Sequence, residues 1–283
     1  MKTMDNDTKK TQSSLRLLFL GTGAADYDWN RYGEPGMRGC ASTLLDGSVL
    51  LDAGVTAWKS LTRWRVNPAA LTDLVVTHTH DDHFDPPAIR EIVSARDVSC
   101  APLRIWTTPE GCDLLRSELP SARCDLHALS WGDSFMAGAD LKFTALPSNH
   151  LIHERLREET FWYLIESPRA NLLYALDGAW MTPRAAHLLY GRPLDAIVWD
   201  GTMERTGDMR AFEHSDLTML ELEIAALKAR GTVHDGTRQI ITHLARTLWP
   251  EEAEARRRAA ARGFLMASDG LEVAVAPQAA GSP

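Results

Sequence analysis

Histidine and aspartate side chains gather in one short segment of this 283-residue chain. The apolar run Asp73–Val76 is followed closely by His78, His80, Asp82 and His83. Imidazole nitrogens and carboxylate oxygens are ligands that zinc, iron and manganese accept in proteins. If the strand continues, His78 and His80 face the same side, because side chains alternate along a strand. The pattern therefore predicts a metal site at the end of a buried strand.

Three later residues are further candidates for the same site. His150 follows the turn Pro147-Ser148-Asn149, and Asp177 and His243 each come at the end of an apolar, strand-like run. Taken alone, each would more often be a structural residue. Together with the cluster they indicate ligands, because the strands of a sheet deliver their ends to one rim.

The spacing His78-x-His80-x-Asp82-His83 resembles the H-x-H-x-D-H signature of the metallo-β-lactamase fold superfamily. The similarity extends from Leu15 to Ala276, and the other landmarks follow in the family's order: Leu51–Gly54, Leu146–His150, Leu173–Gly178 and Ile240–His243. The resemblance implies the α/β fold of this superfamily, a four-layer αββα sandwich.

The resemblance also implies two divalent metal ions, zinc or manganese rather than iron. His78, His80 and His150 would hold one ion; Asp82, His83 and His243 would hold the other, with Asp177 as a bridge. Asp82 would also orient the attacking hydroxide, and Asp52 would support the ligand loop from behind. Two such ions lower the pKa of a shared water and polarise a phosphoryl or carbonyl oxygen.

Within the superfamily, the chain is most similar to the PhnP-like cyclic phosphodiesterases, which are related to RNase Z. Four stretches carry this similarity: 20–24, 146–150, 213–217 and 263–275. The third implies that His214, just before a helix, acts on the scissile phosphate by hydrogen bonding or by protonating the leaving oxygen. A helix N-terminus also attracts anions.

Two positions depart from the PhnP-like pattern. Those proteins carry a cysteine-rich segment that binds a structural zinc, but Cys40 is the single cysteine before position 100, so we expect no such zinc. Arg246 stands where the last motif has a second histidine. Arg246, and His153 in the charged segment 151–160, could contact substrate or face solvent. The aromatic loop 24–38 could line the mouth of the cleft or pack as a lid.

Hydrophobic periodicity and turn signals predict alternating strands and helices along the chain. We expect strands at 15–20, 41–45, 49–52, 73–76, 103–106, 141–145, 161–166, 171–175, 196–200, 239–242 and 271–276. Helices are expected at 56–63, 86–95, 183–190, 216–229 and 251–262, with Ser215 as the N-cap of the fourth. We expect one domain, 15–276, between loose tails at 1–14 and 277–283.

The composition of the chain limits the kinds of molecule that it can bind. Hydrophobic residues make up 45% and charged residues 24%, and the net charge of −8 disfavours a large nucleic acid. No apolar run is long enough to span a membrane, and the polar start lacks the core of a signal peptide, so we expect a cytoplasmic protein. A homodimer is possible.

The sequence thus predicts a dinuclear metal-dependent hydrolase. The favoured substrate is a small cyclic or nucleotide-like phosphodiester, attacked by a hydroxide held at the metal ions. One alternative is a lactonase or another carboxyl-ester or amide hydrolase. The other is a non-hydrolytic metalloenzyme of the same fold, active in oxygen chemistry or cofactor biosynthesis.

Overall fold

The computed structural model describes residues 14–277, and its strands form two mixed sheets. The first sheet has the order β14 (Glu272–Val275), β1 (Leu15–Gly21), β2 (Ser42–Leu45), β3 (Val49–Leu51), β4 (Asp73–Val75), β5 (Leu103–Thr107), β6 (Cys124–Ala128). The second has the order β13 (Leu265–Met266), β12 (Arg238–Thr242), β11 (Ala196–Asp200), β10 (Asn171–Ala175), β9 (Phe161–Glu166), β8 (Leu141–Pro147), β7 (Ser134–Ala137).

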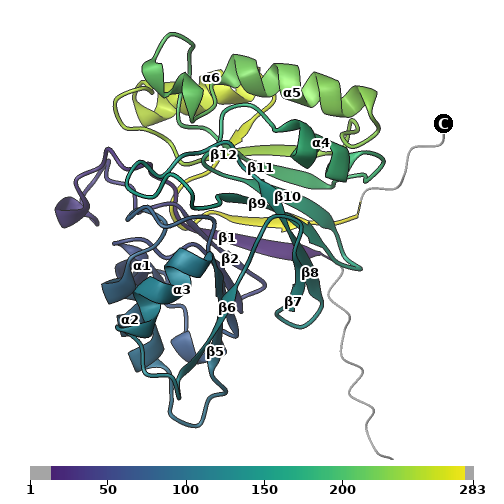
Figure 1. Ribbon diagram of the computed structural model, residues 1–283. Helices are drawn as coiled ribbons and strands as arrows, with labels where there is room; N and C mark the ends of the chain where they lie inside the picture. Colours follow the sequence, from purple (N-terminus) through teal and green to yellow (C-terminus); the bar gives the residue numbers. More distant parts are fainter. Residues whose placement is uncertain (1–13, 278–283) are drawn as a thin grey trace, which may run out of the picture.

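Helices cover the outer face of each sheet (Figure 1). One group consists of α1 (Ala57–Arg63), α2 (Pro86–Ala95) and α3 (Pro109–Arg116), and the other of α4 (Pro183–Leu189), α5 (Leu217–Ala229) and α6 (Glu252–Ala261). Three short 3-10 helices, η1 (Trp29–Arg31), η2 (Pro68–Ala70) and η3 (Met209–Phe212), lie in the connections. The predicted αββα sandwich is confirmed.

Three apolar clusters separate the four layers. The largest lies between the sheets, because alternate residues of each strand, such as Leu15, Leu17 and Phe19 of β1, point inward. The other two lie between each sheet and its helices. Packing on both faces explains why strands such as β11 are buried at every position.

The apolar cluster between the sheets leads to a prediction about stability. Phe143 is fully buried, with its ring 5.3 Å from Phe135 and 5.8 Å from Tyr163, centroid to centroid. Phe143→Ala should lower the free energy of unfolding by about 3–5 kcal/mol, because it leaves a cavity that the rigid sheets cannot fill. Urea denaturation measures this loss. The control Met136→Ala, on neighbouring β7 and 53% exposed, should change stability by less than about 0.5 kcal/mol; equal losses would contradict the assignment of the core.

Strand direction places many loops at one edge of the molecule. In the second sheet, β10, β11 and β12 are parallel. Strand β8 runs in the same direction as β10, because both strands pair antiparallel with β9. In the first sheet, β3, β4 and β5 are parallel. The carboxyl ends of β8, β10, β11 and β12 therefore meet at one edge of their sheet.

Some local expectations were wrong. The N-cap of α5 is Asp216, whose carboxylate accepts hydrogen bonds from Thr218 N and Met219 N, whereas Ser215 Oγ donates to the carbonyl of Gly178. Strand β4 ends at Val75, so His78 and His80 belong to a loop. Helix α3 and strands β6, β7 and β13 were not predicted.

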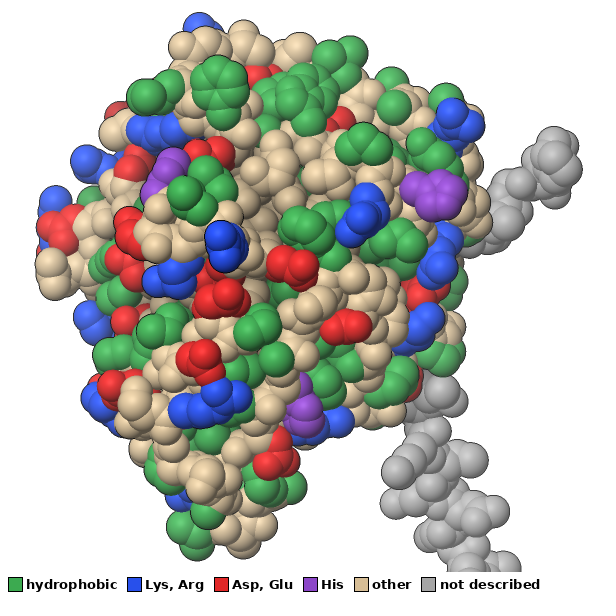
Figure 2. Space-filling view, in the orientation of Figure 1, with side chains coloured by type: hydrophobic (Ala, Val, Ile, Leu, Met, Phe, Trp, Pro, Cys, Tyr) green, Lys and Arg blue, Asp and Glu red, His purple; other side chains and the backbone are tan. Residues whose placement is uncertain are grey.

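Charged side chains of both signs are interspersed on the face shown in Figure 2. No helix among residues 14–277 is long and apolar enough to cross a membrane. The predicted tails fall outside the described residues, apart from Ser14 and Pro277.

Candidate metal centre

The predicted ligands come from loops that leave the carboxyl ends of strands. The segment 78–83 connects β4 to α2, and His150 follows β8. Asp177 follows β10 and His243 follows β12 directly. Residues more than 160 positions apart therefore reach one centre, because parallel strands end at one edge.

Within residues 14–277, three of the five non-glycine residues with positive φ lie beside this edge. Asp52, Asp177 and His243 adopt left-handed conformations, with φ of 60°, 48° and 56°. Residues other than glycine rarely occupy this region, and such strain clusters at functional sites. At each of these positions the chain turns sharply at the end of a strand and directs a side chain to the centre.

A glycine lets another turn pack against the ligand loop. Ala53 N and Val55 N donate to the carbonyls of His83 and Asp81 at 2.7 and 3.0 Å. A Cβ on Gly54 would lie 2.1 Å from the Asp82 carbonyl oxygen. The turn after β3 therefore supports the ligand loop only with glycine at this position.

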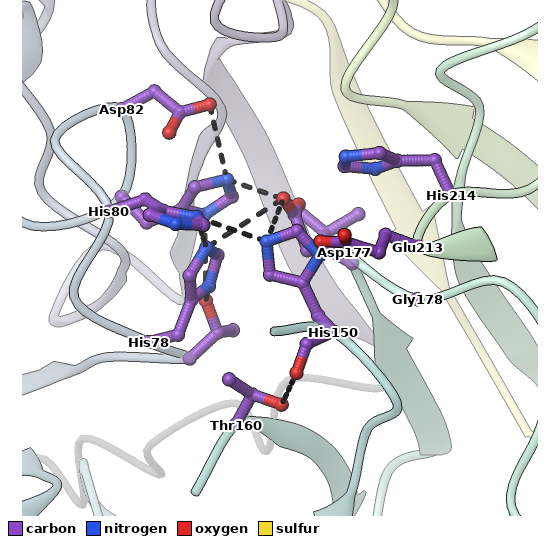
Figure 3. A network of polar contacts seen from close by, with 12 residues as sticks. His78, His80, Asp82, His150, Thr160, Asp177, Gly178, Glu213 and His214 are labelled. Carbon is purple, nitrogen blue, oxygen red and sulfur yellow. Dashed lines mark hydrogen bonds and ion pairs between the residues drawn. The ribbon is translucent and has the colours of Figure 1, made fainter. Parts of the chain in front are cut away.

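Three histidine nitrogens converge in the first donor set. His80 Nδ1 lies 3.1 Å from His78 Nε2 and 3.0 Å from His150 Nε2. Both Nε2 atoms lie 3.7 Å from Asp177 Oδ2. Figure 3 shows the three rings turned toward one another and toward Asp177.

The second donor set surrounds the other oxygen of the Asp177 carboxylate. Asp177 Oδ1 is 3.1 Å from His83 Nε2 and 3.3 Å from His243 Nε2. Asp82 Oδ2 is 3.5 and 3.3 Å from these two nitrogens. Each oxygen of Asp177 thus belongs to a different set of donors.

These distances fit divalent metal ions. Ligands about 2.0–2.1 Å from a tetrahedral zinc ion lie about 3.3 Å from one another. His83 Nε2 and Asp177 Oδ1 are buried and have no hydrogen-bond partner, although such atoms are nearly always paired. A cation between the donors would satisfy both atoms.

The charges of the centre also favour a cation. Burial, together with neighbouring histidines, holds the pKa of His78 well below its usual value and lowers the pKa of His150 to about 4, so both rings keep a free lone pair. Burial also disfavours charge on His243, but Asp177 and other carboxylates raise its pKa to about 10. Without metal, protons therefore balance the buried carboxylates, and metal ions would displace those protons.

Hydrogen bonds from residues behind the predicted ligands hold their rings in place. Asp52 lies 3.0 Å from His83 Nδ1, and it accepts a hydrogen bond from Thr77 N at 2.7 Å. Thr202 Oγ1 lies 2.8 Å from His243 Nδ1. Such contacts set the tautomer and the angle of a ligating ring. Asp52 thus contacts the ligand loop from behind, through His83 and Thr77.

A cavity of about 410 Å³ opens over both donor sets. His214 lies in its wall, and its ring is stacked 5.4 Å from that of His243. Asp200 Oδ2 is 2.8 Å from His214 Nδ1. Burial lowers the pKa of His214, but Asp200 outweighs this effect and the net shift is upward.

Sequence reasoning missed Asp200. It is the last residue of β11, and its carboxylate contacts His214 and also accepts hydrogen bonds from Thr202 N at 2.8 Å and Thr202 Oγ1 at 2.6 Å. The available signal was the run Ala196–Asp200, an apolar strand that ends in aspartate just as the strand before Asp177 does.

Glu213 was also overlooked as a separate residue. It lies in the cavity wall, with one carboxylate oxygen 3.5 Å from His150 Nδ1 and the other 3.3 Å from His153 Nε2. His153 is 67% exposed and lies outside the cavity lining. It therefore sits at the rim, joined to the cavity through Glu213.

Arg246 lies away from the donor sets. It lines a separate cavity with Tyr27 and Arg38, while its backbone nitrogen donates to Asp26 Oδ1 at 2.7 Å. Of the loop 24–38, Ala24, Ala25 and Asp26 line the main cavity. The aromatic part of this loop is absent from that lining, so the start of the loop, rather than its rings, borders the centre.

Comparisons with known proteins agree with this geometry. A sequence model described as the β-lactamase superfamily domain matches residues 48–277, and the chain therefore belongs to that family. A search of curated proteins gives no significant match.

Solved structures share the fold at low sequence identity. Zn²⁺-bound PqqB from Methylobacterium extorquens has a TM-score of 0.69 and 16% identity, covering 91% of this chain and 99% of that one. A diphosphatase of the PhnP family has a TM-score of 0.66 and 20% identity, covering 92% and 97%. Human tRNase Z, short form, has a TM-score of 0.64 and 16% identity, covering 92% and 99%.

The predicted resemblance to the metallo-β-lactamase fold, with PhnP-family and RNase Z relatives, is confirmed. The family and the histidine–aspartate donor sets define a metal-dependent hydrolase of this fold.

Proposed function

We propose that this protein is a phosphodiesterase that uses two divalent metal ions, zinc or manganese, to hydrolyse a small cyclic or nucleotide-like phosphodiester. The observation that carries the proposal is the carboxylate of Asp177, whose two oxygens belong to two separate donor sets. His214 faces the same cavity and supplies a group for the phosphate.

The metal ions would be held by His78, His80 and His150 on one side, by Asp82, His83 and His243 on the other, and by Asp177 between them. When bound, they supply a water of lowered pKa and an electrophile for the phosphoryl oxygen. Asp82 lines the cavity beside His243 and can orient the attacking water through its carboxylate.

His214 supplies the proton. Asp200 accepts from Nδ1, which leaves Nε2 to face the substrate. From there the ring can hydrogen-bond a non-bridging oxygen or protonate the leaving oxygen. Asp200 holds the ring in this orientation and favours its protonated form, as an acid catalyst requires.

The similar structures support phosphate chemistry over the carboxyl-ester or amide alternative. One is named as a diphosphatase and another as a tRNase Z. The net charge of −8 opposes binding of a long phosphate backbone, which disfavours a tRNA-sized substrate. A zinc-bound neighbour favours zinc among the candidate metals.

The decisive experiment compares substrate classes on protein loaded with zinc or with manganese. We expect two metal ions per chain by elemental analysis and turnover of bis(p-nitrophenyl) phosphate. A panel of lactones and p-nitrophenyl acetate serves as the comparison. Cleavage of lactones with no phosphodiester turnover would overturn the proposal in favour of the alternative hydrolase, and an iron-dependent oxidation would favour the non-hydrolytic one. Light scattering would test whether the chain forms a homodimer.

The Asp200–His214 contact makes a prediction about pH. Asp200→Asn removes the charge that raises the pKa of His214, so this pKa should fall. Because the acid must be protonated, activity is lost as pH rises through the pKa. The alkaline limb of the kcat profile for bis(p-nitrophenyl) phosphate should therefore move to lower pH.

The control Asp81→Asn removes a charge from the wall of the same cavity without touching His214. It should leave the alkaline limb in place. An unmoved limb in Asp200→Asn would show that His214 is not the titrating acid.

A further inference from the structure

Within residues 14–277, Arg210 is the one arginine or lysine whose side chain lines the main cavity. The wall also carries the carboxylates of Asp26, Asp81 and Glu213, in addition to those of Asp82 and Asp177. An anionic substrate entering this cavity is repelled by the first three groups, which the donor sets do not include. Arg210 therefore carries a positive charge along the path of the substrate that, unlike that of a histidine, does not depend on pH in the neutral range.

The backbone fixes Arg210 relative to His214. Arg210 lies in η3, where its N–H donates to Asp208 Oδ1 at 2.9 Å. Its carbonyl oxygen accepts hydrogen bonds from Glu213 N at 2.9 Å and from His214 N at 2.7 Å. The arginine and the proposed acid thus belong to one hydrogen-bonded turn, so a ligand could contact both.

The guanidinium group of Arg210 retains its hydrogen-bonding capacity. Its nearest carboxylate oxygens, on Asp208 and Asp26, are 3.6 and 3.9 Å away, and it makes no side-chain hydrogen bond with the described part of the chain. Asp26 is already occupied, because it accepts hydrogen bonds from the backbone nitrogens of Arg246 and Thr247 at 2.7 and 3.1 Å. The carboxylates of Asp208 and Asp26 therefore orient the guanidinium group of Arg210, and its N–H donors can still bind a ligand.

Other arginines near the centre are committed to the fold. Arg155 donates to Thr79 Oγ1 and to Glu158, and Arg38 donates to Thr22 and Glu252. Arg246 lines a different cavity. Among these arginines, Arg210 alone combines a place in the cavity wall with unused donors.

We propose that Arg210 binds the anionic group of the substrate and thereby sets the preference of the site for phosphodiesters over neutral esters of similar size. A guanidinium group offers two parallel N–H donors that match two phosphate oxygens. This inference rests on the proposed phosphodiesterase function and names the residue that recognises the charge of the substrate.

The first test measures binding and does not depend on turnover. Inorganic phosphate is titrated into zinc-loaded protein by calorimetry, with metal content checked before each titration. Arg210→Met, which keeps an unbranched side chain but removes the charge, should weaken phosphate binding by about tenfold to a hundredfold. Arg210→Lys should weaken phosphate binding less than Arg210→Met, because lysine keeps the positive charge although it lacks the two parallel N–H donors of the guanidinium group.

The matched control is Arg205→Met. Arg205 lies five residues earlier, is 73% exposed and lines another cavity, and its loss changes the net charge equally. It should bind phosphate like the unmodified protein. Unchanged binding by Arg210→Met, or an equal loss in Arg205→Met, would overturn the assignment.

The second test measures selectivity. Arg210→Met should raise KM for bis(p-nitrophenyl) phosphate while leaving kcat/KM for p-nitrophenyl acetate unchanged. An equal fall for both substrates would show a general structural role and refute the assignment. If the unmodified protein cleaves no phosphodiester, the proposed function fails, and the phosphate titration still decides whether Arg210 binds the anion.

Discussion

His80→Ala should abolish activity and remove the first of the two metal ions. His80 Nδ1 lies at nearly equal distances from the two other donors of its set, 3.1 Å from His78 Nε2 and 3.0 Å from His150 Nε2. Without it, that set keeps two imidazoles and one oxygen of the Asp177 carboxylate. Loss of a residue that hydrogen-bonds to a ligand typically weakens metal binding by about 10–100-fold. Loss of the ligand itself should weaken metal binding further.

The measurement is metal content after dialysis, followed by turnover of bis(p-nitrophenyl) phosphate. The second donor set does not include His80, so we expect metal content to fall from two ions per chain toward one. His187→Ala, on helix α4 outside both donor sets, is the control and should keep both ions. Full metal content in His80→Ala would rule out the first set as a metal site.

His214→Ala should keep both metal ions and lower phosphodiester turnover by about 10²–10⁴-fold, the range for loss of an acid–base group. His214 lies in the cavity wall and is absent from the two ligand sets that Asp177 joins. The substitution removes the ring that contacts Asp200 and faces the substrate. Metal analysis together with kcat separates this catalytic loss from a loss of ligand.

The comparison for His214 is His153→Ala. His153 is 67% exposed and reaches the site only through its contact with Glu213, so its removal should change kcat much less. A fully active His214→Ala would remove the main argument for phosphodiester chemistry. Loss of metal from His214→Ala would instead place His214 among the ligands, where its distance from Asp200 and His243 also permits it.

Local patterns in the sequence were sufficient to predict the class of the protein and to name the candidate ligands. The cluster 78–83 is local, so its residue types and spacing are visible without a fold. His150, Asp177 and His243 are distant, yet each follows a strand whose periodicity can be recognised. The layered architecture follows from the same alternation of strands and helices, since each element must bury an apolar face.

The contacts between the candidate residues could be learned only from the folded structure. Parallel strands that meet at one edge place each oxygen of Asp177 beside a different donor set. The same arrangement brings Asp200 to His214 and places Arg210 in the cavity wall. The sequence left open whether Arg246 contacts substrate or faces solvent, and the structure places it in the lining of another cavity. Spacing along the chain specifies which side chains are available, whereas their directions depend on long-range packing that no local pattern encodes.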